Sequence, residues 1–389
     1  MHKSLGCFRK KERPKLAILL LIMKKLEPMK KIILTCCALV LAFGASAQHR
    51  ESHDILEKLI WNEEKLNIML DTRFDLNTTI NNGDVDAFSF NGQTLKVWFA
   101  GEIYPGIRYR VRHRFNKPQN PLMRDNLSGA TDHAWIAFDL GKNWTLTAGK
   151  QSVQLGTYEY DYNPADIYLG SMIYNDFDGY KIGVDAAWKF LGQTIHFQVV
   201  NSDSPQFADE EHANKAMAGS VMWEGNLFDG VLKTRWGYSA FQHSDSKFYQ
   251  WVTAGTQLNI CNFTTELDYY MGDRNMDYSS LVGLNAENRH VRDQSASVNL
   301  KYSFGRWHPF IKGVWSERRD QVFDEKAYQN WGVQGVVEFY PFKQDVLKDL
   351  RFHLAYSYNQ TDFKGQFTDL ESLDTHSILF GMRWLFKVK

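Results

Sequence analysis

The side chains best suited to ligand chemistry in this sequence are four arginines at alternate positions of one short segment. Residues 107–115 read IRYRVRHRF, in which every second residue is an arginine: Arg108, Arg110, Arg112 and Arg114. In an extended chain, alternate side chains point to one face at a spacing of about 6.6 to 7 Å. Guanidinium groups bind carboxylates and phosphates through paired hydrogen bonds. The segment therefore predicts a column of anion-binding groups, and Lys96 on the preceding segment lies on the same predicted face.

A structural role for the same arginines is the alternative. Acids on neighbouring segments could pair with them and stiffen the wall, and the candidates are Asp71, Asp75, Glu102 and Asp139. Residues 48–389 carry 43 acidic and 35 basic side chains, so partners are plentiful. The residue pattern leaves both interpretations open.

A second cluster combines tyrosines with carboxylates in residues 152–176. Its members include Tyr158, Glu159, Tyr160, Asp161 and Asp166. We interpret this segment as a loop that folds inward and narrows a passage. Cation binding is the alternative, although the spacing is not that of an EF-hand. Trp98, Trp135 and Tyr270 could stack on sugar rings or simply pack in a wall.

Enzyme chemistry is not indicated by the sequence. HExxH, GxSxG and P-loop motifs are absent, and the 12 histidines are scattered. Residues 48–389 contain one cysteine, Cys261, which excludes an intrachain disulfide and a cysteine-based metal site there. We expect no catalytic residues, no cofactor and no resident metal.

In the segments that would position these residues, apolar and polar side chains alternate with a period of two. Residues 66–76, LNIMLDTRFDL, alternate apolar and polar side chains over eleven positions, which is a strand signal. Similar patterns predict about sixteen strands, at 66–80, 93–102, 106–115, 131–140, 143–151, 177–190, 193–201, 214–227, 231–243, 249–260, 263–272, 291–304, 307–318, 328–340, 350–361 and 374–387.

The connections between these strands alternate strictly between short and long. The long ones are 81–92, 116–130, 152–176, 202–213, 244–248, 273–290, 319–327 and 362–373. Short turns at one rim and long loops at the other are typical of an antiparallel β-barrel in the bacterial outer membrane, with short periplasmic turns and long extracellular loops. A soluble all-β sandwich is the alternative. Aromatic residues near strand ends favour the barrel, and they include Trp144, Phe190, Phe304, Phe339 and Phe386.

The N-terminal region has the pattern of an export signal. A positively charged start at Met29 precedes an apolar stretch over 32–43 and the small-residue site at 45–47. We predict a signal peptide over 1–47, a translation start at Met29 and cleavage before Gln48. Residues 48–65 predict a short periplasmic amphipathic helix, and 66–389 the barrel. The chain after residue 47 has a net charge of −8, which argues against nucleic-acid binding.

Several local motifs resemble the phosphate-selective porin O/P family, in its Bacteroidetes-type branch. They are the runs ATDHAW at 130–135, LTAGKQ at 146–151 and GTYEYDYNPAD at 156–166, together with the arginine segment upstream. The resemblance implies a sixteen-stranded outer-membrane porin, commonly a homotrimer, with a basic ladder at Arg108, Arg110, Arg112 and Arg114.

The predicted function is therefore a water-filled channel for passive uptake of small hydrophilic solutes, with anions such as phosphate as candidates. The expected surroundings are outer-membrane lipid and lipopolysaccharide, and the C-terminal strand predicts recognition by the barrel-assembly machinery. Alternatives are a general non-selective porin, an alginate-export-like barrel for acidic polysaccharide, and a structural or adhesin barrel that does not transport.

Overall fold

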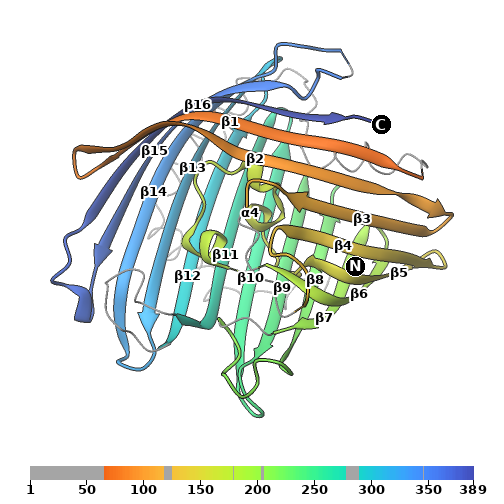
Figure 1. Ribbon diagram of the computed structural model, residues 1–389, viewed down its shortest axis with the longest axis horizontal. Coiled ribbons are helices and arrows are strands. Elements are labelled where there is room, and N and C mark those ends of the chain that lie inside the picture. The colour runs from red at the N-terminus through yellow and green to blue at the C-terminus, as the bar shows by residue number, and fades with distance from the viewer. Residues whose placement is uncertain (1–64, 118–124, 178, 203–205, 277–288, 345) are drawn as a thin grey trace, which may run out of the picture. The chain divides into compact units, whose positions relative to one another are not determined.

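Sixteen antiparallel strands close into one barrel in the computed structural model, which describes residues 65–117, 125–177, 179–202, 206–276, 289–344 and 346–389. Each strand pairs with its neighbours in the chain, and β1 pairs with β16 to close the ring (Figure 1). The predicted fold class is confirmed. The strands are β1 (Asn67–Asn81), β2 (Asp84–Tyr104), β3 (Ile107–Arg114), β4 (Thr131–Leu140), β5 (Trp144–Ser152), β6 (Tyr180–Phe190), β7 (Gln193–Asn201), β8 (Met217–Leu227), β9 (Leu232–Gln242), β10 (Phe248–Ile260), β11 (Phe263–Met276), β12 (Arg289–Tyr302), β13 (Trp307–Asp320), β14 (Glu325–Phe339), β15 (Arg351–Phe363) and β16 (Leu373–Lys387).

The two faces of the wall differ in polarity, as the period-two pattern requires. On β11, Glu266 and Asp268 are buried while Leu267 between them is 52% exposed. Polar side chains thus line the inside, and apolar side chains cover the outside. Aromatic pairs lie at strand ends, for example Trp307 with Phe339, whose ring centroids are 4.4 Å apart. Within the described ranges, no helix combines the length and apolar character needed to cross a bilayer.

The predicted long link over 81–92 is wrong. A two-residue turn at Asn82 and Gly83, both with positive φ (49° and 91°), connects β1 directly to β2, which begins at Asp84. Asn-Gly is the preferred pair for such hairpin turns, because both residues tolerate this conformation. Links 243–247 and 321–324 at the same rim are also short, so the alternation of connection lengths is not strict.

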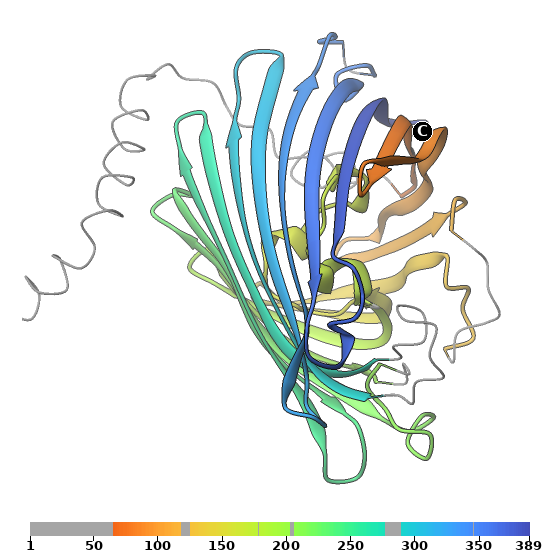
Figure 2. The same cartoon turned by 90° about the vertical axis from the view of Figure 1, so that its left-hand side faces the viewer.

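The connection between β5 and β6 lies inside the barrel, and we call residues 153–177 the inner loop. It contains α4 (Tyr158–Asp161), η1 (Pro164–Asp166) and α5 (Met172–Asp176). A capping side chain precedes each of these short helices and accepts a backbone hydrogen bond, namely Thr157, Asn163 and Ser171. Figures 1 and 2 show these helices enclosed by the strands. The predicted signal peptide over 1–47 lies outside the described residues, as does the predicted helix over 48–65 apart from Lys65.

Candidate functional site

The inner loop is anchored first to the wall at β11. The carboxylate of Asp268 accepts hydrogen bonds from the backbone N–H groups of Tyr158 and Glu159, each at 2.8 Å. Two residues further along the same strand, the hydroxyl of Tyr270 accepts a hydrogen bond from that of Thr157 at 2.6 Å. All of these groups are buried, so β11 fixes both the start of α4 and its orientation.

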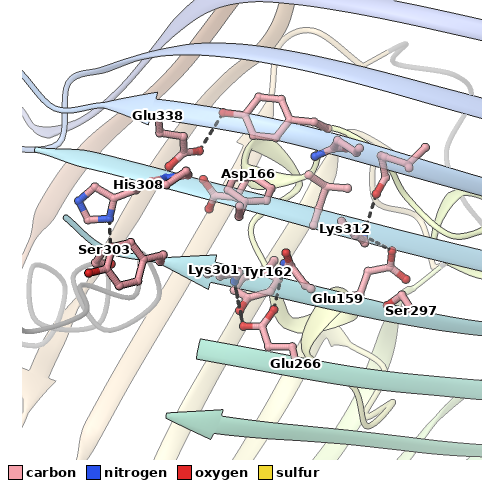
Figure 3. A pocket seen from close by; sticks show the side chains of 18 of the residues that line it. Glu159, Tyr162, Asp166, Glu266, Ser297, Lys301, Ser303, His308, Lys312 and Glu338 are labelled. Carbon is pink, nitrogen blue, oxygen red and sulfur yellow. Dashed lines mark hydrogen bonds and ion pairs between the residues drawn. The ribbon is translucent and has the colours of Figure 1, made fainter. Parts of the chain in front are cut away.

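Ion pairs fix the side of α4 that faces β12 and β13. Nζ of Lys312 lies 2.6 Å from Oε1 of Glu159, which also accepts the backbone N–H of Ser171 at 2.8 Å. Lys301 and Glu266 form a pair at 2.8 Å. The hydroxyl of Tyr162 donates to Glu266 in the same cluster (Figure 3). Through these contacts Glu159 anchors the inner loop to the wall, whereas the sequence analysis predicts it as a residue of the constriction.

A third set of contacts ties the inner loop to the seam where β1 meets β16. Asp166 pairs with both Arg351 and Arg383, and Arg383 also pairs with Asp71 at 2.9 Å. The amide of Asn163 joins the two sides of the β1–β2 hairpin. It donates to Asp71 at 2.7 Å and accepts from Lys96 at 2.6 Å.

The end of the loop packs on two aromatic side chains, Trp251 on β10 and Phe207 in the connection between β7 and β8. The ring of Phe177 lies 4.9 Å from that of Trp251 and 5.7 Å from that of Phe207, measured between centroids. Asp176, beside it, pairs with Arg274 at 2.9 Å and with Arg318 at 3.1 Å. The loop thus contacts strands from β10 through β16 to β1 and β2, and it leaves separate spaces beside it.

The predicted arginine column lies on β3 and forms ion pairs with acids of β4. Arg108 pairs with Asp139 at 2.7 Å, while Asp132 pairs with Arg112 at 2.9 Å and with Arg114 at 2.6 Å. Asp139 is among the expected partners, whereas Asp132 is not. The other expected partners bond elsewhere: Asp71 to Arg383, Asp75 to Arg73 and His353, and Glu102 to the backbone N–H of Gly106.

Aromatic rings hold the guanidinium groups in the column. The guanidinium carbon of Arg112 lies 4.9 Å from the Trp98 ring centre and 5.1 Å from that of Tyr180. Arg110 lies 5.3 Å from the ring centre of Trp135. Stacking of this kind is favourable and restricts the arginine to one orientation. Of the three aromatic residues proposed as sugar platforms, Trp98 and Trp135 thus stack on arginine, and Tyr270 is fully buried against the loop.

Two cavities follow one another along the arginine column. The first, of about 220 Å³, is lined by Arg110 and Arg112 and also by Arg235 and Arg383. The second, of about 450 Å³, is lined by Arg114 and Lys117. Both are bounded by the same three tyrosines, which makes them neighbours: Tyr160, Tyr162 and Tyr180. A third cavity of about 90 Å³ lies on the side of the loop that faces β11 to β15 (Figure 3).

Sequence reasoning missed several residues of these cavities. Arg235 on β9 and Arg383 on β16 come from strands with no arginine repeat, and only the closed ring brings them to β3. Tyr180 begins β6 and bonds to Arg112, its hydroxyl 2.6 Å from Nη2. Asp132 lies within the motif ATDHAW, so its charge beside an arginine strand was the available signal. Among the described residues, no group of three or more His, Cys, Asp or Glu could hold a metal ion.

A closed barrel with an apolar outside, a charged interior and an inward-folded loop defines a channel of the outer-membrane porin class. The chain belongs to the family of phosphate-selective porins O and P, whose model matches residues 64–386. A search of curated protein sequences gives no significant match. Membership of this family makes the molecule an outer-membrane channel for transport.

Solved structures with the same fold are outer-membrane proteins of low sequence identity. The channel DcaP of Acinetobacter baumannii is 12% identical with a TM-score of 0.58, over 82% of this chain and 97% of that one. The anion-selective porin of Comamonas acidovorans is 9% identical with a TM-score of 0.55, over 83% and 99%. OmpT of Vibrio cholerae, in a trimer form, is 9% identical with a TM-score of 0.54, over 83% and 100%. At these identities the likeness concerns the fold.

Proposed function

We propose that this porin passes small hydrophilic solutes with a preference for anions, and that the anions move along the arginine column. The path runs past Lys117 and Arg114 in the larger cavity, and then past Arg112 and Arg110 in the smaller one. Arg108 is the last of the column toward the rim that carries the turn at 105–106.

The observation that carries this proposal is the charge of the smaller cavity. Four guanidinium groups line it, against the two carboxylates of Asp161 and Glu224. Arg235 interacts with both of these acids, while Arg112 and Arg383 pair with carboxylates outside the lining. Within the lining, the excess of positive charge therefore lies toward the column. A narrow space of one sign between walls of low dielectric concentrates ions of the opposite sign. Phosphate fits the forks of arginine and is the anion that the family description suggests.

The inner loop is the constriction in this proposal. Tyr160 and Asp161 face the column across the smaller cavity, while Tyr158, Glu159 and Asp166 hold the loop to the wall. Of the five residues that the sequence analysis groups as one constriction, two thus line the smaller cavity and three anchor the loop, and the anchors Glu159 and Asp166 also line the cavity of about 90 Å³. The anion-selective porin of Comamonas acidovorans, which has the same fold, supports a selective channel in this architecture.

A general, non-selective porin is the second candidate, and the ion pairs of the column favour it. Asp132 and Asp139 between them neutralise part of the charge of Arg108, Arg112 and Arg114. If that compensation is sufficient, the arginines stabilise the wall and leave the current indifferent to the sign of the ion.

Assembly and export belong to the same proposal. The trimer form of OmpT supports a homotrimer for this barrel. An exported outer-membrane chain needs a signal peptide, for which residues 1–47 with cleavage before Gln48 are suited, and residues 48–65 would then form a periplasmic helix. The barrel-assembly machinery and lipopolysaccharide are its expected partners in the membrane.

The reversal potential in planar bilayers under a KCl gradient tests this function. We expect anion preference and block by phosphate in the wild type, and loss of both in Arg110→Ala/Arg112→Ala. Arg306→Ala removes one exposed arginine from a rim turn and should leave the potential unchanged. A current without ion preference, equal in all three proteins, would establish the non-selective porin instead. Circular dichroism confirms that each variant retains its β-sheet.

A further inference from the structure

We infer that the cavity of about 220 Å³ beside the arginine column is a binding subsite for a small aromatic carboxylate. This inference rests on the proposed function, because it names the class of anion that the path retains. The subsite lies between the inner loop, which contributes Tyr160 and Tyr162, and the wall formed by β2, β3 and β4, which contributes Trp98.

The first observation is a buried donor without a partner. The side chain of Trp98 is 1% exposed, and its indole Nε1 has no hydrogen-bond partner among the residues that the structure describes. Trp98 lines the cavity. An indole nitrogen can only donate, and buried donors in folded proteins are almost always bonded to protein, water or ligand. An acceptor on an occupant of the cavity, whether water or ligand, would satisfy this donor.

A second polar atom beside the same cavity has the same property. His133 on β4 is 8% exposed, and its Nδ1 has no partner in the described part of the chain, while Nε2 lies 3.4 Å from the hydroxyl oxygen of Ser152. The imidazole is edge-on to Trp98, with ring centroids 6.3 Å apart. Strands β2 and β4, which lie on either side of β3, thus bring two unsatisfied buried groups to one space.

The charge around these groups selects an anion. Arg110 and Arg112 line the cavity from β3, and Arg383 lines it from β16. The two carboxylates of the lining, Asp161 and Glu224, both pair with Arg235 on β9. Stacking on Trp98 and Tyr180 fixes the guanidinium of Arg112 before any ligand arrives, so little further ordering is needed on binding. A carboxylate offers several acceptor sites, enough for the indole N–H and one or two guanidinium donors together.

The volume of the cavity and its lining residues favour a ligand with an aromatic ring. An apolar cavity of about 150 Å³ holds benzene in another protein, so about 220 Å³ accommodates a benzene ring with a carboxylate attached. Chloride or inorganic phosphate would fill a small part of this space. Tyr160, Tyr162, Tyr180 and Leu385 supply rings and an apolar side chain against which an aromatic solute can pack.

Block of the KCl current in planar bilayers by benzoate at neutral pH, with the full-length mature protein, tests the inference. We expect benzoate to block at far lower concentration than acetate, which has the same carboxylate without the ring. Trp98→Phe keeps a ring but removes the N–H, and should raise the half-blocking concentration of benzoate about tenfold, as loss of a hydrogen bond to a charged group does. Trp236→Phe, on the outer face, should leave this concentration unchanged.

The outcomes separate this inference from the proposed function. Equal block by benzoate and acetate, or unchanged block in Trp98→Phe, overturns the aromatic subsite while the anion preference in KCl stands on its own measurement. Tighter block by phosphate than by benzoate assigns the cavity to inorganic anions and also overturns it. The comparison of benzoate with acetate in the unmodified protein decides the matter even if Trp98→Phe does not fold.

Discussion

Arg112 and Asp132 form a buried ion pair between β3 and β4, with 2.9 Å from Nε to Oδ2 and side chains that are 5% and 0% exposed. The same carboxylate pairs with Arg114 at 2.6 Å. One acid thus sets both the position and the net charge of two arginines that line the proposed path. A substitution of Asp132 should therefore change both the charge that the ions meet and the stability of the wall, and the two effects can be measured separately.

Replacement of Asp132 by asparagine should make the channel more selective for anions and less stable. The loss of one negative charge raises the positive charge at the column, so the reversal potential under a KCl gradient shifts further toward chloride. Breaking a buried pair typically costs about 3–5 kcal/mol in the free energy of unfolding. Asp139→Asn, which breaks a more exposed pair with Arg108, should cost about 1 kcal/mol or less. Equal urea stability of the two variants would contradict this assignment.

Gly255→Ala should displace the inner loop. A methyl group at Gly255 on β10 would lie 2.6 Å from Cα of Thr157 and 2.8 Å from a carboxylate oxygen of Asp268, and backbone cannot yield as a flexible side chain does. We expect a changed single-channel conductance and a loss of about 1–3 kcal/mol in unfolding free energy. Gly335→Ala on β14 is the matched control, because nothing lies within 4 Å of the added carbon. Identical conductance in both variants would show that the loop does not set the current.

Asp268→Asn should loosen the start of α4. The carboxylate accepts two backbone N–H groups, and the amide that replaces it retains only one oxygen to accept them. Noisier single-channel currents and about a twofold higher mean conductance are expected, since about 1–3 kcal/mol of anchoring is lost. Asp273→Asn, near the end of the same strand, breaks a contact with Arg292 and should leave the conductance unaltered. A quiet current of normal size in Asp268→Asn would argue against this anchor.

The contact between two rim loops should depend on pH through His212. Its ring nitrogens bond to Asp245 and Asp209, each at 2.8 Å, and these bonds raise the pKa of His212 above the usual 6.5. The bond with His212 in turn lowers the pKa of Asp245 from 3.8. The stabilisation by His212 is therefore complete below pH 6.5 and is lost as the pH rises through the raised value. The part due to Asp245 is present above pH 3.8 and is lost as the pH falls through the lowered value.

Hydrogen exchange of residues 206–216, corrected for the intrinsic pH effect, measures this dependence. Exchange should be slowest between pH 3.8 and pH 6.5 and faster on both sides. His212→Gln should abolish the change on the alkaline side. His376→Gln, which removes a contact with Tyr356 on β15, should preserve it. Protection that stays constant from pH 6.5 upward in the wild type would count against the contact.

The barrel was predictable from sequence because each strand carries its own signal. Alternation on β11, for example, places Glu266 and Asp268 inside and Leu267 outside, with no information needed from other strands. The link at 81–92 failed for a local reason as well. The polar residues there predict a loop, although Asn82 and Gly83 are a strong hairpin signal.

The site was only partly predictable, because its partners come from distant parts of the ring. The arginine column was visible on β3 alone, since alternate spacing on one strand is a local property. Its pairing with Asp132, on the next strand, depended on register, which a shift of one residue would reverse. The guanidinium groups of Arg235 and Arg383 meet the inner loop only after sixteen strands have closed.

Arg383 also has a consequence for the order in which the channel is built. It lies on the last strand, 312 residues after Asp71 on the first strand and 217 residues after Asp166 in the inner loop, and it pairs with both. Until β16 pairs with β1, the loop lacks this contact and the barrel is open between these two strands. The final step of barrel assembly therefore closes the wall and also completes the anchoring of the loop. An incompletely closed barrel would form a wider and less selective pore than the closed one.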